Sequence, residues 1–181
     1  MGKNILVLTG SPRNGGNSDL LADAFIKGAE AAGHEVVKFK TAVKRIKGCV
    51  ACDKCFSKGA ACIYQDDFNE LAMLLANADT LVLATPLYWY TFPAQLKAAI
   101  DKIYAFIVGN EPLKITECLL LTCGEITEES AFDGIVKSYE LIAEDRGWID
   151  RGHLIVKGVG PKGAIKNTTA LKEAEKLGCG I

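Results

Sequence analysis

This sequence has few histidines, almost no net charge and no long apolar run. Only two of its 181 residues are histidines, His34 and His153, and the formal net charge is −1. Neither histidine stands beside another candidate residue, so chemistry that needs a nucleophile and a base has no support. A nearly neutral chain is not steered towards nucleic acid or anionic membranes. No stretch approaches the roughly 18 apolar residues of a membrane span. We therefore expect no nucleic-acid partner and no membrane partner.

The first residues show no targeting pattern. Met1 to Asn4 lead straight into an apolar run without the features of a cleavable signal peptide. Residue 6 is leucine, where a myristoylation motif has serine or threonine. These absences predict a cytoplasmic protein. In that compartment, seven cysteines indicate free thiols, metal ligands or redox chemistry rather than a disulfide framework.

What the sequence does contain is an alternation of short apolar runs and helical patterns. Its length and its composition, 49% hydrophobic and 24% charged, suit one domain over residues 1–181. Strands that alternate with helices predict βαβ units and a parallel sheet. The fold class is therefore predicted to be α/β, a doubly wound five-stranded parallel sheet with helices on both faces. The expected strands are 4–9, 35–39, 80–84, 115–122 and 152–157, and the expected helices are 18–32, 67–76, 94–106, 131–146 and 168–177.

Ligands of doubly wound folds bind beyond the carboxyl ends of the strands, at the switch point. The first loop there, GSPRNGGNS at residues 10–18, precedes a helix. Unpaired N–H groups at a helix N-terminus bind phosphate, and small residues let the backbone close around it. The side chains expected to add donors and charge are Ser11, Arg13, Asn17 and Ser18. The alternative is an ordinary glycine-rich turn in which Asn17 or Ser18 only caps the helix.

Two better-known phosphate motifs are absent from this loop. Gly15 is followed by Gly16-Asn17 instead of the Lys-Ser/Thr of a triphosphate P-loop, and Gly10 is followed by Ser11-Pro12, which breaks a G-x-G-x-x-G pattern. A single phosphate monoester is therefore the expected ligand.

The loop at 86–92 contains three consecutive aromatic residues, Tyr88, Trp89 and Tyr90. They suit either a flat aromatic ligand or a subunit interface, since such residues are enriched in both. The loop at 123–130 offers Cys123 and Gly124 to another edge of a ring. A phosphate site beside an aromatic wall predicts FMN.

With these residues the chain resembles the flavodoxin-like NADPH-dependent FMN reductase family. GSPRNGGNS at 10–18 and PLYWYTFPAQLKAAIDK at 86–102 carry the resemblance, which extends over nearly the whole chain. It implies non-covalently bound FMN with its phosphate on the first loop and its ring against Pro86, Leu87, Tyr88 and Trp89. It also implies hydride transfer from NAD(P)H and a homodimer or homotetramer.

The segment CVACDKCFSKGAACIYQDDF, residues 49–68, is similar to the cysteine segment of iron–sulfur flavoproteins. Cys49, Cys52 and Cys55 follow a C-x2-C-x2-C spacing, and Cys62 comes shortly after them. Thiolates at this spacing can hold the corners of a 4Fe–4S cluster. Reduced thiols or a partial disulfide, and a zinc site, remain open as alternatives.

Three functional hypotheses follow. The first is an enzyme that transfers electrons from NAD(P)H through FMN to a quinone, flavin or other small acceptor; it needs no catalytic acid or base from the protein, because hydride moves directly between stacked rings. The second is an iron–sulfur flavoprotein that exchanges electrons with ferredoxin through a 4Fe–4S cluster and FMN. The third is a non-enzymatic flavodoxin-like binding module. The sequence leaves the electron acceptor and the choice between NADH and NADPH open.

Overall fold

The computed structural model describes residues 2–181, and five strands form one sheet in which all neighbours are parallel. Their order is β2-β1-β3-β4-β5, the flavodoxin-like order with its switch point between β1 and β3. The predicted fold class is therefore confirmed. The strands are β1 (Asn4–Thr9), β2 (Glu35–Lys40), β3 (Thr80–Pro86), β4 (Glu117–Cys123) and β5 (Ile149–Val156).

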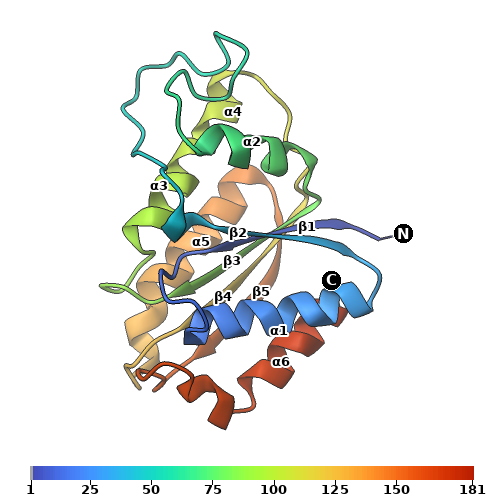
Figure 1. Ribbon diagram of the computed structural model, residues 1–181, viewed down its shortest axis with the longest axis vertical. Helices are drawn as coiled ribbons and strands as arrows, with labels where there is room; N and C mark the ends of the chain where they lie inside the picture. The colour runs from blue at the N-terminus through green and yellow to red at the C-terminus, as the bar shows by residue number, and fades with distance from the viewer. Residues whose placement is uncertain (1) are drawn as a thin grey trace.

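Helices cover both faces of this sheet (Figure 1). On one face lie α1 (Asn17–Ala31) and α6 (Ala170–Cys179); on the other lie α2 (Phe68–Asn77), α3 (Ala94–Lys102) and α5 (Asp133–Arg146). The short elements are α4 (Tyr104–Val108) and the 3-10 turns η1 (Thr41–Val43), η2 (Glu129–Phe132) and η3 (Ala164–Asn167). Over residues 2–181, every helix is too short or too polar to cross a membrane.

The sheet divides the core into two layers. Side chains alternate along a strand, so Leu6 and Leu8 of β1 pack with α2, α3 and α5, whereas Ile5 and Val7 pack with α1 and α6. Because both faces are covered, the central strands β1, β3 and β4 are apolar almost throughout. This is the pattern from which the strands were predicted.

The predicted helix over 94–106 is wrong in one respect, because it divides at Ile103. Ile103 donates its N–H to the carbonyl of Ile100, and Phe106 donates to Ile103, so the chain makes tight three-residue turns between α3 and α4. The turn follows Lys102, whose buried ammonium pairs with Asp66. Strand β5 starts at Ile149, earlier than the predicted residue 152. The prediction missed its first residues because they are exposed and lack an apolar pattern.

Helices α1 and α6 approach each other unusually closely. A Cβ atom added to Gly28 would lie 1.9 Å from the carbonyl oxygen of Glu175, and one added to Gly178 would lie 2.1 Å from that of Phe25. Only glycine at these two positions allows the backbones to touch.

A long segment without helix or strand connects η1 to α2 and contains four cysteines, Cys49, Cys52, Cys55 and Cys62. Figure 1 shows it in teal at the end of the molecule that carries α2 and α4, away from the loops that follow β1, β4 and β5. We call residues 44–67 the cysteine segment.

Candidate functional site

A cavity of about 190 Å³ lies where the loops after β1, β3, β4 and β5 meet. The fold positions it at the carboxyl ends of the strands, at the switch point. Nine of the ten residues expected to bind a cofactor line it: Ser11, Arg13, Asn17, Ser18, Pro86, Leu87, Tyr88, Cys123 and Gly124. The tenth, Trp89, does not.

The first loop folds tightly enough that small residues are required. Gly15 has φ of +65°, and a Cβ at Gly10 would lie 2.7 Å from Oγ1 of Thr85. The Gly15 N–H donates to Oδ2 of the buried Asp19 at 2.8 Å, and Ser11 Oγ accepts the N–H of Arg13 at 3.1 Å. The loop is thus held open as a cradle before α1 begins.

The N-terminus of α1 faces this cradle without a side-chain cap. Gly16 is the N-cap residue, so the alternative that Asn17 or Ser18 caps the helix is wrong. Within residues 2–181, the backbone N–H groups of 17–19 have no acceptor. They are therefore available to an anion.

The Asn17 side chain is committed elsewhere. Its amide nitrogen donates to the carbonyl oxygens of Val159 at 2.8 Å and Pro161 at 2.9 Å, and its oxygen accepts the N–H of Ile165 at 3.3 Å. The side chain thus ties the first loop to the connection after β5. Asn17 can offer its backbone N–H to a phosphate, whereas its amide is used within the protein.

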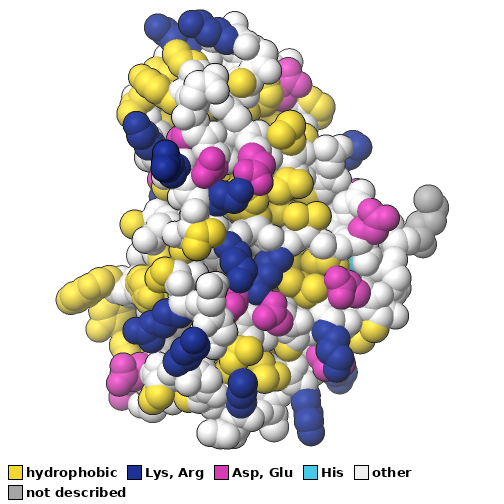
Figure 2. Space-filling view, in the orientation of Figure 1, with side chains coloured by type: hydrophobic (Ala, Val, Ile, Leu, Met, Phe, Trp, Pro, Cys, Tyr) yellow, Lys and Arg dark blue, Asp and Glu magenta, His cyan; other side chains and the backbone are white. Residues whose placement is uncertain are grey.

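The aromatic loop is a two-residue hairpin. Tyr88 and Thr91 exchange both backbone hydrogen bonds, and the central residues Trp89 and Tyr90 have φ of +45° and +65°. Such a turn favours Asn-Gly, so two aromatic residues there store backbone strain. Trp89 is 91% exposed, and Figure 2 shows hydrophobic side chains projecting at this edge of the molecule. The cavity wall is formed by Tyr88, not by Trp89.

The third loop is joined to its neighbours through the backbone. Leu87 donates its N–H to the carbonyl of Cys123 at 2.8 Å, and Val159 donates to the carbonyl of Gly124 at 2.8 Å. Burial raises the pKa of the Cys123 thiol to about 12, so this sulfur stays protonated at neutral pH. Cys123 is a neutral part of the wall.

A fourth loop, after β5, was missed by the sequence reasoning. It supplies Val159, Gly160 and Lys162 to the cavity, and the third loop adds Glu125. The signal was present, because GVGPKG at 158–163 is a glycine-rich stretch directly after a strand. Lys162 and Arg13 are the two basic residues lining the cavity.

A second cavity, of about 30 Å³, is lined by all four cysteines of the cysteine segment. Burial, then the charges that Cys52, Cys62 and Cys49 would carry as thiolates, raises the pKa of Cys55. Four thiolates here would repel one another unless a cationic centre bound them. Among residues 2–181, no three Cys, His, Asp or Glu side chains come close enough to share one metal ion.

The backbone of the cysteine segment is unusual beside that cavity. Ala51, Asp53 and Phe56 all have positive φ, between 50° and 56°. Across the described chain, none of the backbone N–H groups of 48–55 has a hydrogen-bond acceptor. Left-handed residues in such a run turn N–H groups inward, as around many iron–sulfur clusters. The donors fit a cluster, but the small cavity means that residues 48–55 would have to move outward.

Contacts within the chain anchor the cysteine segment at several points. The Asn69 side chain accepts a hydrogen bond from the Cys62 N–H and donates one to the Cys62 carbonyl oxygen. The Phe56 ring packs edge-on against the Phe106 ring, with 5.5 Å between the ring centroids. Asp66 accepts hydrogen bonds from the Lys47 N–H and from Lys102. The Lys102 side chain is 5% exposed and borders the cysteine cavity.

The sequence profile of the NADPH-dependent FMN reductase family matches residues 3–125. The chain belongs to this family.

The similar proteins include iron–sulfur flavoproteins and an FMN-containing oxidoreductase, the two kinds of flavoprotein that the sequence suggests. An iron–sulfur flavoprotein of Archaeoglobus fulgidus is 37% identical over 105 residues, which are 58% of this chain and 46% of that protein. A Bacillus subtilis protein, provisionally named an NAD(P)H-dependent FMN-containing oxidoreductase, is 23% identical over 96% of this chain and 95% of its own length. The solved NAD(P)H:quinone oxidoreductase of Methanothermobacter marburgensis has a TM-score of 0.78 and 20% identity, and the match covers 99% of this chain and 96% of that one. It shows the same fold.

Four iron–sulfur flavoproteins, the first of them the Archaeoglobus protein, match this chain over 46% to 56% of their length. The chain therefore spans about half of each of these relatives.

Proposed function

We propose that this chain is an FMN-dependent oxidoreductase that transfers electrons from NAD(P)H to a quinone, flavin or other small acceptor. The observation that carries the proposal is the 190 Å³ cavity, where a phosphate cradle and the aromatic loop meet at the switch point. The family membership and the Bacillus relative support the same chemistry.

Each loop has a distinct role in this proposal. Ser11, Arg13, Ser18 and the free N–H groups of α1 bind the phosphate of FMN, with Asn17 contributing its backbone. Pro86, Leu87 and Tyr88 form one wall for the ring, and Cys123 and Gly124 bound another edge. Trp89 lies beyond the wall, where it can contact a partner subunit or a second ring.

Bound FMN supplies the hydride-accepting ring. Pro86, Leu87 and Tyr88, with Cys123 and Gly124, would orient this ring and exclude water from the part that they contact. The neutral Cys123 thiol neither gives up nor takes a proton at neutral pH. No acid or base of the protein is required, because positioning two rings in contact is sufficient for hydride transfer.

A second function is favoured by the cysteine cavity, namely an iron–sulfur flavoprotein that exchanges electrons with ferredoxin. Cys49, Cys52, Cys55 and Cys62 would hold a 4Fe–4S cluster, and the N–H groups of 48–55 would face its sulfurs. The relatives named iron–sulfur flavoproteins support this candidate.

We also propose that residues 1–181 act as one FMN-binding unit, that the protein is cytoplasmic, and that it forms a homodimer or homotetramer. The exposed hairpin tip at Trp89 supports assembly, since an isolated chain leaves this aromatic side chain in water.

One anaerobic preparation, with iron and sulfide supplied, tests these functions. If the protein is a reductase, it should be yellow, bind FMN tightly and oxidise NAD(P)H when a quinone is present. A measured content of about four irons per chain would support the iron–sulfur function in addition. A colourless protein that rejects FMN would contradict both and favour the binding module. The double variant Ser18→Ala with Arg13→Ala should bind FMN at least tenfold more weakly, because it loses charge-assisted hydrogen bonds.

A further inference from the structure

We propose that Lys162 is a phosphate-binding residue of the cofactor site and that Asn17 is the positioning residue that holds it there. This inference rests on the proposed binding of FMN. It assigns to the loop after β5 a role in telling a phosphorylated flavin from an unphosphorylated one.

Lys162 lies directly against the phosphate cradle. A Cβ added to Gly15 would lie 3.7 Å from its Cε atom and 4.0 Å from its Nζ atom. Gly15 has the positive φ that shapes the cradle, so the ammonium group stands beside the turn that would enclose the anion. Lys162 lines the same cavity as Ser11, Arg13 and Ser18.

Lys162 and Arg13 are both free to pair with a ligand. Over residues 2–181, neither forms a salt bridge. The lysines behind the cradle differ, because Lys38 and Lys40 are both paired with Asp19. The Asp19 carboxylate thus has Lys38 and Lys40 as its cationic partners, and it does not pair with Lys162.

The charge of the ligand calls for two cations. A phosphate monoester carries about −1.5 to −2 at neutral pH. Arg13 supplies a single positive charge, and Glu125, the acidic residue that lines the cavity, adds a negative one. The side chain of Glu125 lies over Gly160, so the loop that carries Lys162 also meets this carboxylate. Lys162 brings the protein's charge closer to balance with the phosphate.

Asn17 fixes the loop that presents Lys162. Its buried side chain makes hydrogen bonds to Val159 and Pro161 before Lys162 and to Ile165 after it. The three bonds bracket the lysine on both sides. Since Asn17 also begins α1, one residue sets the distance between the helix N-terminus and the ammonium group.

The experiment compares FMN with riboflavin, which has the same ring but no phosphate. Flavin-free full-length protein is titrated with each, and binding is followed by quenching of flavin fluorescence. In Lys162→Gln the dissociation constant for FMN should rise about 10- to 100-fold, the loss of one charge-assisted hydrogen bond, while that for riboflavin stays unchanged. Lys162→Arg should retain most FMN affinity, and Lys166→Gln, which changes another exposed lysine, in η3, should match the wild type.

Asn17→Ala tests the positioning role. It should weaken FMN binding selectively, and the effect should largely disappear when Lys162→Gln is already present, because both changes remove one interaction. Unchanged riboflavin binding shows that the cavity is still folded. Fully additive losses would overturn the role given to Asn17.

Two results would overturn the role given to Lys162: unchanged FMN affinity in Lys162→Gln, or equal weakening of FMN and riboflavin binding. Failure of the proposed function is seen separately, because the wild type itself would then bind no FMN.

Discussion

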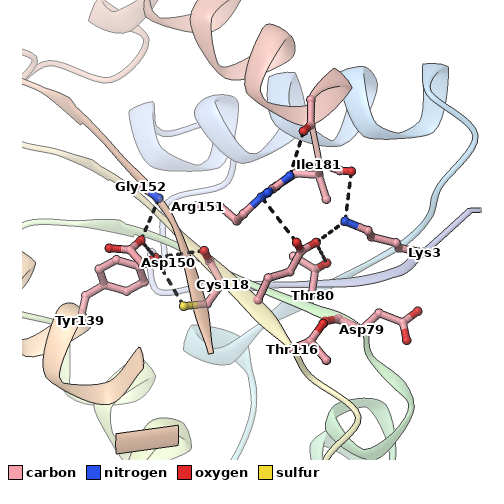
Figure 3. Close-up of polar contacts among 12 residues, drawn as sticks. Lys3, Asp79, Thr80, Thr116, Cys118, Tyr139, Asp150, Arg151, Gly152 and Ile181 are labelled. Atoms are coloured by element: carbon pink, nitrogen blue, oxygen red, sulfur yellow. Dashed lines mark hydrogen bonds and ion pairs between the residues drawn. The ribbon is translucent and has the colours of Figure 1, made fainter. Parts of the chain in front are cut away.

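Glu117 is a buried carboxylate that joins three strands. Lys3 donates to its Oε1 at 2.6 Å and Thr80 at 2.7 Å, while Arg151 lies 3.4 Å from its Oε2. Figure 3 shows Lys3, Thr80 and Arg151 directed to this point, with Lys3 also donating to the carbonyl oxygen of Ile181. Burial alone would raise the pKa of Glu117, but the hydrogen bonds and the positive charges outweigh it and lower that pKa below its ordinary value of 4.5.

This lowered pKa predicts acid sensitivity. Because Glu117 binds a proton more weakly in the folded protein than in the unfolded one, its contribution is complete above about pH 4.5 and is lost as the pH falls through the folded-state pKa. Glu117→Gln should be about 2 kcal/mol less stable at pH 7, and the difference should shrink in acid. Urea unfolding between pH 7 and pH 3 measures it. Glu129→Gln, which removes an exposed carboxylate, should change stability little at any pH. A constant gap between Glu117→Gln and the wild type would contradict the prediction.

Trp89 is strained and exposed, a combination that folding alone does not favour. Asparagine tolerates positive φ better than tryptophan does. Trp89→Asn should therefore raise the free energy of unfolding of the isolated chain by about 1 kcal/mol, whereas Trp89→Phe, which keeps the strain, should not. If the side chain serves assembly or hydride transfer, the stabilised variant should be the poorer reductase or the weaker oligomer. Denaturant unfolding, stopped-flow flavin reduction and light scattering compare them.

At the scale of elements, the cysteine segment depends on one buried ion pair. Lys102 of α3 and Asp66 are 5% and 3% exposed. Lys102→Met leaves the carboxylate buried without its partner and should cost about 3 to 5 kcal/mol. The double variant with Asp66→Asn should recover part of the loss.

The same helix provides the control for Lys102→Met. Lys97 pairs with Asp101 on the exposed surface of the helix, so Lys97→Met should lower the free energy of unfolding by less than about 1 kcal/mol. Thermal or urea unfolding of the three variants and the wild type decides it; equal losses in Lys97→Met and Lys102→Met would show that burial of the pair does not matter.

The contact between α1 and α6 is equally specific. Gly28→Ala or Gly178→Ala would push the backbones apart and should destabilise the fold by at least about 2 kcal/mol. Gly180→Ala adds a Cβ whose nearest neighbours lie 3.6 Å away, so it should be tolerated. Differential scanning calorimetry of the three variants would reveal the contrast.

At the scale of the whole molecule, the two cavities share no lining residue. The cofactor cavity lies at the ends of the strands, and the cysteine cavity lies beside α4 and the start of α2. Loss of one ligand should therefore leave the other bound. Cys52→Ala should abolish any iron while changing the FMN dissociation constant less than twofold, which parallel iron analysis and FMN titration would measure. A large loss of FMN affinity would show that the sites are coupled.

The parts of this arrangement that the sequence predicts are the local ones. Strands β1 and β3 are buried on both faces, so short apolar runs reveal them, and the glycines before α1 mark the phosphate cradle. The parts missed depend on distance along the chain. Asn17 bonds to Val159, 142 positions away, and no local pattern shows that its amide is occupied or that Lys162 stands across the cavity. The helix divides at Ile103, directly after Lys102, whose partner Asp66 lies in the cysteine segment, and that segment has no periodicity from which its position could be predicted.

The close contact between Gly28 and α6 also has a consequence for how the protein is made. A chain emerging from the ribosome completes α1 early, but the surface that α1 presents to α6 has no partner until residues 170–179 appear. The apolar side chains of that face, Phe25 and Ala29 among them, lack their α6 neighbours until then. Contacts this distant in sequence slow folding and expose the growing chain to aggregation. A nascent chain stalled before residue 170 should therefore be a substrate for chaperones, and emergence of α6 from the ribosome should end that dependence.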